Sequence, residues 1–168
     1  KMFTIIRWSF WLVILLSFCS LFLFLIGYYL ASKSLPNYSK IFELLGPVEN
    51  IEIVRDTYNV PHIKAQNEPD AFFALGYAHA QDRLWQLEIL RRKAGGRLSE
   101  VFGVKTLQSD KLYRRLDLLA LAESSLSALP NKVKVNLTSY SQGINARINE
   151  INEFALGRGA PEFFLFPT

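Results

Sequence analysis

Several residue types on which whole classes of protein depend are scarce in this sequence of 168 residues, which has one cysteine and two histidines. A single cysteine excludes a disulfide-stabilised scaffold. The two histidines, His62 and His79, do not form a cluster with metal-ligand spacing. The sequence also lacks the H-E-x-x-H, P-loop and G-x-S-x-G motifs. Residue chemistry alone therefore assigns no catalytic and no metal-binding residue, and it leaves the substrate-binding residues unknown.

A strong excess of one charge is also missing from most of the chain. The sequence has 19 Lys plus Arg against 15 Asp plus Glu, but three of the basic residues lie within residues 1–33, which contain no acid. The remainder is nearly neutral and has no long basic run, which disfavours a nucleic-acid partner. Half of the residues are hydrophobic, so the chain can bury enough surface to exclude a disordered polymer.

Charge is absent altogether from Trp8 to Ser32. As a helix this stretch is roughly 37 Å long, more than the ~30 Å hydrocarbon core of a bilayer. A cleaved signal peptide is the alternative, but its apolar region is usually shorter, and Tyr29-Leu30-Ala31 is a poor cleavage site. Residues 1–33 therefore predict one transmembrane anchor in contact with lipid. Basic residues at both ends leave its orientation open.

Beyond the anchor, residues 34–50 have no periodicity and predict a juxtamembrane linker, and residues 51–168 form the predicted domain. Within that domain, residues 51–55 and 61–65 alternate apolar and polar side chains around a short turn at residues 57–59. This pattern is typical of a β-hairpin.

Three helices follow in the predicted domain. Asn67 is placed to cap a long helix that runs to about Lys93, has a buried first half and ends at Gly95-Gly96. Apolar residues at helical spacing then predict two more helices, separated at Pro130, with core-facing stripes. The first stripe is Leu112, Leu116, Leu119, Ala122, Leu126 and Leu129, and the second is Val133, Leu137, Tyr140, Ile144, Ile148 and Ile151.

Several conspicuous polar residues have a structural interpretation. We expect His62 to be a buried, hydrogen-bonded strand residue, and Arg55-Asp56 to brace the end of a strand. The polar stripe His79, Asp82, Arg83 and Gln86 allows three interpretations: a network that supports a site, a solvated face, or a buried Asp82–Arg83 pair that docks the helix on strands. We favour the buried pair.

The end of the predicted long helix and the tail of the chain differ in character. Arg91-Arg92-Lys93 predicts a solvated helix end, where cations suit the negative end of the helix dipole. The apolar tail from Phe163 to Phe166 has no evident partner in the sequence and predicts contact with further polypeptide.

Three motifs in order resemble the start of the α chain of the penicillin acylase family. Residues 53–65 read IVRDTYNVPHIKA, residues 71–88 read AFFALGYAHAQDRLWQLE, and residues 96–103 read GRLSEVFG. A weaker resemblance extends over about residues 50 to 165. Asn59 replaces a glycine that is common in the family, and asparagine also tolerates positive φ in a turn.

The resemblance implies an N-terminal-nucleophile hydrolase, a zymogen that cleaves itself into α and β chains. The fold class is then α+β: part of a four-layer αββα sandwich, mostly helical in this chain and preceded by one transmembrane helix. The nucleophile is Ser, Cys or Thr at the start of the β chain, and its own α-amine acts as base. The family's acyl-pocket residues and calcium ligand follow the segment that resembles this sequence, so none is assigned here. A structural calcium is expected in the complete heterodimer and no cofactor in this chain.

The expected function is that of a linear-amide hydrolase in which this chain alone is inactive. Its expected partners are a β chain from the same precursor, membrane lipid and a small acyl-amide substrate, with the domain on the periplasmic side of a bacterial inner membrane. The identity of the acyl group stays open. The alternative is a non-catalytic, membrane-anchored accessory or structural subunit that retains part of the acylase fold.

Overall fold

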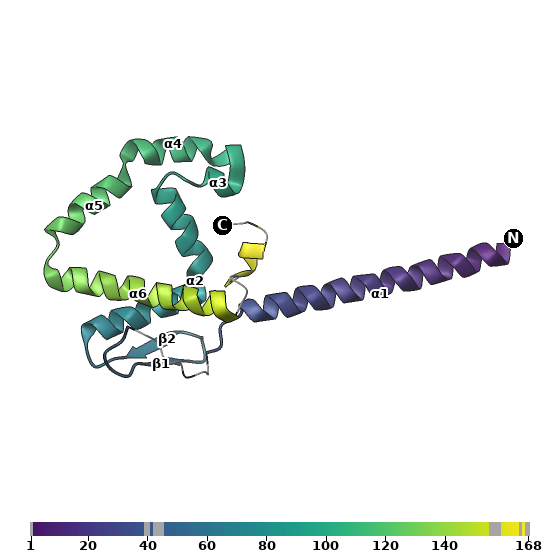
Figure 1. Ribbon diagram of the computed structural model, residues 1–168, viewed down its shortest axis with the longest axis horizontal. Coiled ribbons are helices and arrows are strands. Elements are labelled where there is room, and N and C mark those ends of the chain that lie inside the picture. Colours follow the sequence, from purple (N-terminus) through teal and green to yellow (C-terminus); the bar gives the residue numbers. More distant parts are fainter. Residues whose placement is uncertain (1, 39–40, 42–45, 155–158, 165, 167–168) are drawn as a thin grey trace. The chain divides into compact units, whose positions relative to one another are not determined.

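The chain forms two compact units, residues 1–35 and residues 36–168, in the computed structural model (Figure 1). The structure describes residues 2–38, 41, 46–154, 159–164 and 166. The described residues are mostly helical, as predicted.

The first unit consists of one helix, α1 (Met2–Ser34). Within the segment Ile6–Lys33, a stretch of 18 residues has a mean hydropathy of 2.6, and no other described residue buries this stretch. The helix is thus long and apolar enough to cross a membrane. A signal sequence would meet the same criterion of length and composition.

The second unit begins with the predicted hairpin. Strands β1 (Glu52–Arg55) and β2 (Pro61–Lys64) pair antiparallel, with Ile53 opposite Ile63. In the turn, Asp56 Oδ1 accepts hydrogen bonds from the backbone N–H groups of Tyr58 and Val60, both at 2.9 Å. Asn59 has a φ of 63°, the left-handed conformation that asparagine tolerates. The hairpin and its turn are confirmed.

The long helix α2 (Glu68–Ala94) is also confirmed, together with its cap. The side chain of Asn67 accepts a hydrogen bond from the backbone N–H of Asp70 at 2.8 Å. Asp70 is itself buried and accepts from the backbone N–H groups of Val48 and Glu49 at 3.0 Å. The helix has a kink at Arg83 (φ −137°, ψ 24°) and ends at Gly95.

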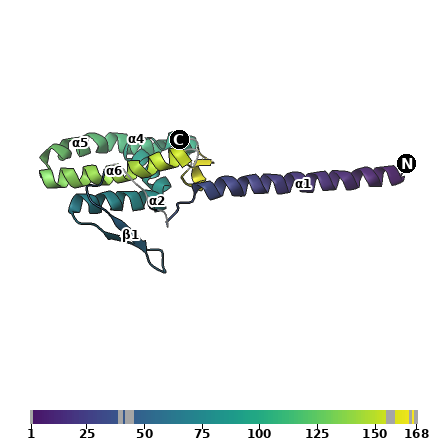
Figure 2. The same cartoon turned by 60° about the horizontal axis from the view of Figure 1, so that its bottom comes forward.

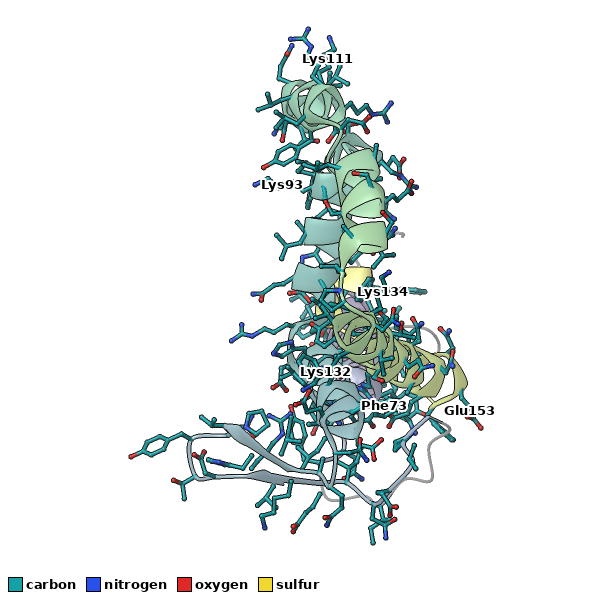
Figure 3. All side chains as sticks on the ribbon, turned by 90° about the vertical axis from the view of Figure 1, so that its left-hand side faces the viewer. Phe73, Lys93, Lys111, Lys132, Lys134 and Glu153 are labelled. Atoms are coloured by element: carbon teal, nitrogen blue, oxygen red, sulfur yellow. The ribbon has the colours of Figure 1, made fainter. Side chains whose placement is uncertain are left out.

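Helix α6 (Asn131–Phe154) lies beside α2, and the two form the centre of the unit (Figures 1 and 2). The helices approach at two glycines. A Cβ on Gly76 would overlap the carbonyl oxygen of Tyr140, and a Cβ on Gly143 would overlap that of Phe73. Phe73, whose backbone carbonyl group makes the second contact, is labelled in Figure 3. Small residues thus allow backbone-to-backbone packing that larger side chains would prevent.

The predicted stripe on α6 is correct in part. Ile151 is buried, but Val133 and Leu137 are exposed, and the other buried residues of the helix are Asn136, Gly143 and Arg147. The close approach at Gly143 turns the helix so that a small and partly polar stripe faces α2. An apolar stripe was expected because the spacing of apolar residues shows which face is hydrophobic, but it does not show that a glycine allows close approach of another helix.

The segment between α2 and α6 contains α3 (Ser99–Phe102), the 3-10 helix η1 (Gly103–Thr106), α4 (Leu107–Leu116) and α5 (Leu118–Ala128). In Figure 1 these elements form an arm from the end of α2 to the start of α6. One helix was predicted where α4 and α5 lie. The left-handed conformation of Asp117, with a φ of 49°, divides it into two.

The core-facing role predicted for the leucines of this arm is wrong within the described chain. The exposed fraction is 54 % for both Leu112 and Leu116, 52 % for Leu119 and 49 % for Leu126. No residue of α5 is buried by the described part of the protein. The predicted pattern is present, but the described residues do not cover it.

The aromatic tail, in contrast, has partners within the chain. Phe163 belongs to the 3-10 helix η2 (Pro161–Phe164). The ring centroid of Trp85 lies 5.2 Å from that of Phe163 and 5.6 Å from that of Phe166. Phe102 lies 5.4 Å from Phe166. The prediction that this tail lacks an internal partner is therefore wrong, because the kinked half of α2 and α3 bring two aromatic rings to it.

Candidate functional site

The junction between the hairpin and α2 is a polar site with several side-chain partners among the described residues. Arg55, at the end of β1, donates hydrogen bonds from Nη1 to Asp82 Oδ2 at 3.0 Å and from Nη2 to Asp82 Oδ1 at 2.9 Å. It also donates to Gln81 Oε1 at 3.2 Å and to the carbonyl oxygen of Asn59 at 3.1 Å. The two-point geometry fixes the guanidinium group relative to the carboxylate.

This junction corrects the predicted Asp82–Arg83 pair. Asp82 pairs with Arg55, and Arg83, the residue at the kink, is exposed. The Arg55 side chain is 9 % exposed and that of Asp82 is 27 % exposed, so the pair is only partly buried. An ion pair does dock the helix on a strand, as predicted, and Arg55 does brace the end of its strand. The partner was misassigned because adjacent residues on a helix do not face each other.

Tyr38 adds an aromatic ring to the junction. The ring centroid lies 4.0 Å from the Arg55 guanidinium carbon, and the hydroxyl group donates a hydrogen bond to Asp82 Oδ1 at 3.3 Å. Burial and the nearby Asp82 carboxylate raise the pKa of Tyr38, and Arg55 opposes this in part. The hydroxyl group therefore stays a hydrogen-bond donor at neutral pH.

The two histidines lie outside this junction. His62 is hydrogen-bonded as predicted, with Nε2 3.2 Å from Asp56 Oδ2, but its side chain is 60 % exposed, so the predicted burial is wrong. The backbone hydrogen bond from Val60 and the contact with His62 lower the pKa of Asp56. His79 is exposed, with Nδ1 2.9 Å from the Tyr140 hydroxyl oxygen. The stripe formed by His79, Asp82, Arg83 and Gln86 is thus mainly solvated.

A buried network between α2 and α6 was not predicted. The Tyr77 hydroxyl donates a hydrogen bond to Glu150 Oε2 at 2.7 Å, and Arg147 Nη1 lies 2.8 Å from the same oxygen. Burial and the Glu150 carboxylate raise the pKa of Tyr77, which keeps the phenol protonated. Arg147 is 4 % exposed, and its buried Nε atom has no hydrogen-bond partner among the described residues. Because Tyr77 and Glu150 are 73 residues apart, no local pattern indicates their contact.

The predicted solvated end of α2 is correct for Arg91 and wrong for Arg92. Arg92 is 7 % exposed, and it donates hydrogen bonds to Glu88 Oε1 at 2.5 Å and to Glu100 Oε2 at 2.7 Å. It therefore links α2 to α3. The sequence signal for this role is the Glu88–Arg92 spacing of four residues, which favours a pair on one helix.

These networks stabilise the unit and do not form a catalytic set. Among the described residues, no group of three or more His, Cys, Asp and Glu is placed to hold a metal ion. Arg55, Glu150 and Arg92 each take part in a contact that joins one element to another. The chemistry of these residues alone defines a framework and assigns no nucleophile or general base.

Comparison with known proteins decides the family. Residues 50–167, most of the second unit, match the family model described as penicillin amidase. This chain belongs to the penicillin amidase family. The matched residues span the three motifs noted in the hairpin, in α2 and around α3, and the sequence-based family assignment is confirmed.

Similar penicillin amidase family members come from Pseudomonas. The chain is 41 % identical to penicillin acylase 2 proenzyme of Pseudomonas sp. (strain SE83) over 113 residues, which are 67 % of this chain and 15 % of that protein. It is 35 % identical to acyl-homoserine lactone acylase QuiP of Pseudomonas fluorescens (strain Pf-5) over 67 % of this chain and 14 % of that protein. The chain thus spans about a seventh of the length of these relatives.

A solved structure of the family has the same fold in this region. Thermostable penicillin G acylase from Alcaligenes faecalis, in its tetragonal form, matches with a TM-score of 0.65 and 27 % identity. The match covers 73 % of this chain and 64 % of that chain. The arrangement of the hairpin and helices is therefore one that occurs in an acylase.

Proposed function

We propose that this chain is the N-terminal, α-chain part of an amidohydrolase that releases an acyl group from an amide. The supporting observation is the family match over residues 50–167, together with 41 % identity to a penicillin acylase proenzyme. The relatives are named as acylases of penicillin and of acyl-homoserine lactones, which both contain an acyl amide. Because the chain spans only about a seventh of these relatives, the proposed activity belongs to the complete protein.

The proposed nucleophile is a Ser, Cys or Thr at the start of a separate β chain. Its free α-amine accepts the side-chain proton while the oxygen or sulfur attacks the carbonyl carbon of the substrate. The carbon–nitrogen bond then breaks, the amine leaves with the proton, and water hydrolyses the acyl-enzyme. The β chain is produced from the same precursor by self-cleavage, and the name proenzyme of the Pseudomonas relative is consistent with processing.

In this proposal the α-chain residues have a structural role. The Arg55–Asp82 junction holds the hairpin on α2, and the Gly76 and Gly143 contacts hold α2 on α6. This framework forms part of a four-layer αββα sandwich that is completed by the β chain. A structural calcium belongs to the complete heterodimer, and we assign it no ligand in this chain.

The proposal includes attachment to the bacterial inner membrane. Helix α1 acts as an uncleaved single-pass anchor, and residues 51–168 lie on the periplasmic side. The apolar span of α1 supports this arrangement. So do the aromatic residues near the ends of α1, which include Trp8, Trp11, Tyr28 and Tyr29.

The proposed activity is tested with the purified full-length protein. Release of free amine is measured with phenylacetyl, medium-chain and long-chain acyl amides, the last two including acyl-homoserine lactones. The matched control replaces the first residue of the β chain with alanine. We expect hydrolysis by the natural protein, and a single uncleaved and inactive precursor for the variant. A correctly folded natural protein that hydrolyses none of these amides would favour the alternative, a non-catalytic anchored subunit.

A further inference from the structure

Helix α4 has a basic and apolar surface that the described residues leave exposed. We define the α4 face as Lys111, Leu112, Arg115 and Leu116, all of which are exposed, the two leucines by 54 % each. Residues four apart lie next to each other along a helix, so the two cations form one row and the two leucines form the neighbouring row. The face ends with α4, before the left-handed Asp117. It is therefore one surface of a single helix.

The opposite side of α4 fixes the direction of this face. Asp110 is buried and accepts a hydrogen bond from the backbone N–H of Leu98 at 2.8 Å. Arg114 donates a hydrogen bond from Nε to the carbonyl oxygen of Gly96 at 2.9 Å. These contacts hold α4 on the segment between α2 and α3, so the α4 face is turned away from that segment. Figure 3 shows Lys111 pointing outward from α4.

Positive charge gathers around the α4 face. Lys93, near the end of α2, has its Nζ atom 5.4 Å from the ring centroid of Tyr113 on α4. Lys105 is exposed in η1, which directly precedes α4. Neither of these lysines, nor Lys111 or Arg115, forms an ion pair with another described residue. Close carboxylates of the described residues therefore do not neutralise these four side chains.

The acidic residues of this region offset only part of the charge. Asp110 is buried on the inner side of α4. Glu100 pairs with Arg92 and with Arg97. Asp117 is exposed at the end of α4. Residues 93–117 contain six basic residues against three acidic ones, although the domain as a whole is nearly neutral. The α4 face thus lies in a locally basic region.

This combination fits a lipid surface better than a protein surface. Lysine is depleted in the centres of protein interfaces, and two half-exposed leucines on a helix of 10 residues offer little apolar area for such a centre. Helices that lie on membranes, in contrast, place leucines at the acyl boundary and Lys or Arg at the level of anionic headgroups. The long stems of Lys111 and Arg115 allow their charges to reach headgroups while the leucines insert.

We infer that the α4 face binds the surface of a bilayer that contains anionic phospholipids. Leu112 and Leu116 insert between the headgroups, and Lys111 and Arg115 contact lipid phosphate groups. The inference rests on the proposed function only in that α1 keeps the domain at a membrane. Tethering raises the local concentration of lipid, so a weak attraction is sufficient for contact.

The test uses the complete natural protein in nanodiscs of phosphatidylcholine and in nanodiscs of phosphatidylglycerol. Hydrogen exchange, measured by mass spectrometry, follows the peptide that contains α4, and a peptide of α6 serves as internal control. We expect exchange in α4 to be at least about threefold slower in phosphatidylglycerol, since contact with headgroups suppresses local opening of the helix. The difference should disappear at high salt, which screens the attraction.

A charge variant links this protection to the α4 face. Lys111→Gln combined with Arg115→Gln keeps the helix and removes two cations, each of which strengthens attraction to an anionic surface by about fivefold. Exchange in α4 of this variant should be equal in the two lipids. The matched control is Lys132→Gln on α6, which removes a lysine with a side chain 71 % exposed and should retain the difference between the lipids.

Three results would overturn the inference. The first is equal exchange of α4 in the two lipids for the natural protein. The second is a difference between the lipids that persists in the double variant, because the cations of the α4 face would then not cause it. The third is slow exchange of α4 in detergent as well as in both nanodiscs, which would show that protein covers the face.

Vesicle sedimentation separates this inference from the proposed anchor. If α1 is removed during maturation, the released protein should still sediment with phosphatidylglycerol vesicles and not with phosphatidylcholine vesicles, and the double variant should bind at least about tenfold more weakly. The anchor then fails and the α4 face stands. Released protein that binds neither vesicle would refute the α4 face, as would nanodisc-bound protein with equal exchange in both lipids. Amide hydrolysis by the same preparations tests the proposed activity independently.

Discussion

Gly143 on α6 lies directly against the backbone carbonyl group of Phe73 on α2, so that a Cβ at this position would overlap the carbonyl oxygen. The backbone of one helix is therefore the packing surface of the other. Gly76 makes the reciprocal contact with the carbonyl group of Tyr140. This pair of contacts sets the separation of the two helices that form the centre of the unit.

Gly143→Ala should lower the free energy of unfolding by about 2 to 3 kcal/mol, because the added methyl group must push two backbones apart. The higher helix propensity of alanine offsets only part of this cost. A thermal or denaturant unfolding curve of the processed protein measures the effect. Asn145→Ala, at an exposed position on the same helix, should change the stability by less than about 0.5 kcal/mol. Equal effects of the two substitutions would contradict the close contact.

Asp82→Asn should destabilise the protein by about 1 to 3 kcal/mol, between the values for an exposed and a buried ion pair. The reason is that Arg55, with a side chain 9 % exposed, loses its carboxylate partner. The control is Glu52→Gln, which breaks the exposed pair with Lys64 and should cost less than about 1 kcal/mol. Thermal shift measurements compare the two variants, and similar small shifts would refute a stabilising role for the junction.

The buried Asp110 should make stability depend on pH. Burial raises the pKa of this carboxyl group, but hydrogen bonds from the Ser99 side chain and from the backbone N–H groups of Ser99 and Leu98 lower it to below its usual value. The ionised form therefore stabilises the fold above the unfolded-state pKa of about 3.9, and this contribution is lost as the pH falls through the lower, folded-state pKa.

Asp110→Asn should accordingly be less stable than the natural protein at pH 7, by about 1 to 3 kcal/mol, and the difference should shrink below about pH 4. Urea unfolding at a series of pH values measures it. Ser99→Ala keeps the carboxylate and removes one of its hydrogen bonds, so it should show the same pH dependence with a smaller amplitude. A difference between Asp110→Asn and the natural protein that is constant with pH would contradict the assignment.

Leu21→Arg should impair membrane insertion of α1, since an arginine near the centre of a membrane-spanning helix costs about 2.5 to 3.5 kcal/mol. The measurement is the fraction of protein that stays in membranes washed with carbonate. Arg7→Lys, which keeps the charge at the end of the apolar span, is the control and should not change this fraction. Release of the natural protein by carbonate, without detergent or protease, would refute the anchor.

Residues 34–168 expressed alone should lack both amide hydrolysis and a cooperative unfolding transition. The two-stranded hairpin is marginal without further strands, and the described residues leave the leucines of α4 and α5, Leu112, Leu116, Leu119 and Leu126, about half exposed. Circular dichroism during heating and an amide hydrolysis assay test these two expectations. A sharp transition would contradict the need for a partner, and hydrolysis by this fragment would contradict the proposed location of the nucleophile.

Local features were predictable because their causes lie within a few residues. The hairpin follows from alternation of side chains and from the turn at Asn59, and the start of α2 follows from the Asn67 cap. The apolar helix α1 needs only a long uncharged stretch. The family was predictable for a similar reason, since its motifs are short and lie in the right order in the hairpin, α2 and α3.

Pairings between distant residues were not predictable from such patterns. Sequence spacing suggested Arg83 as the partner of Asp82, and the partner is Arg55, 27 residues away. Arg92 was predicted to be solvated, but it is buried because it also contacts Glu100 of α3. His62 was predicted to be buried, but its side chain is 60 % exposed because it lies on the open face of the hairpin. The Tyr77–Glu150 contact had no sequence signal at all, since it exists only when α2 and α6 lie together.

The sequence by itself determined the long helices α2 and α6, the hairpin, the long apolar segment and the family, because propensities, caps and periodicity act over one or two turns of chain. The tertiary structure decided which groups meet: Gly143 with the Phe73 carbonyl group, Arg55 with Asp82, and Trp85 with the aromatic tail. It also decided that the leucines of α4 and α5 remain uncovered by the described residues. The physical reason is that an apolar stripe on a helix indicates which face of the helix will be buried. Which segment buries that face depends on how segments distant in the sequence pack together.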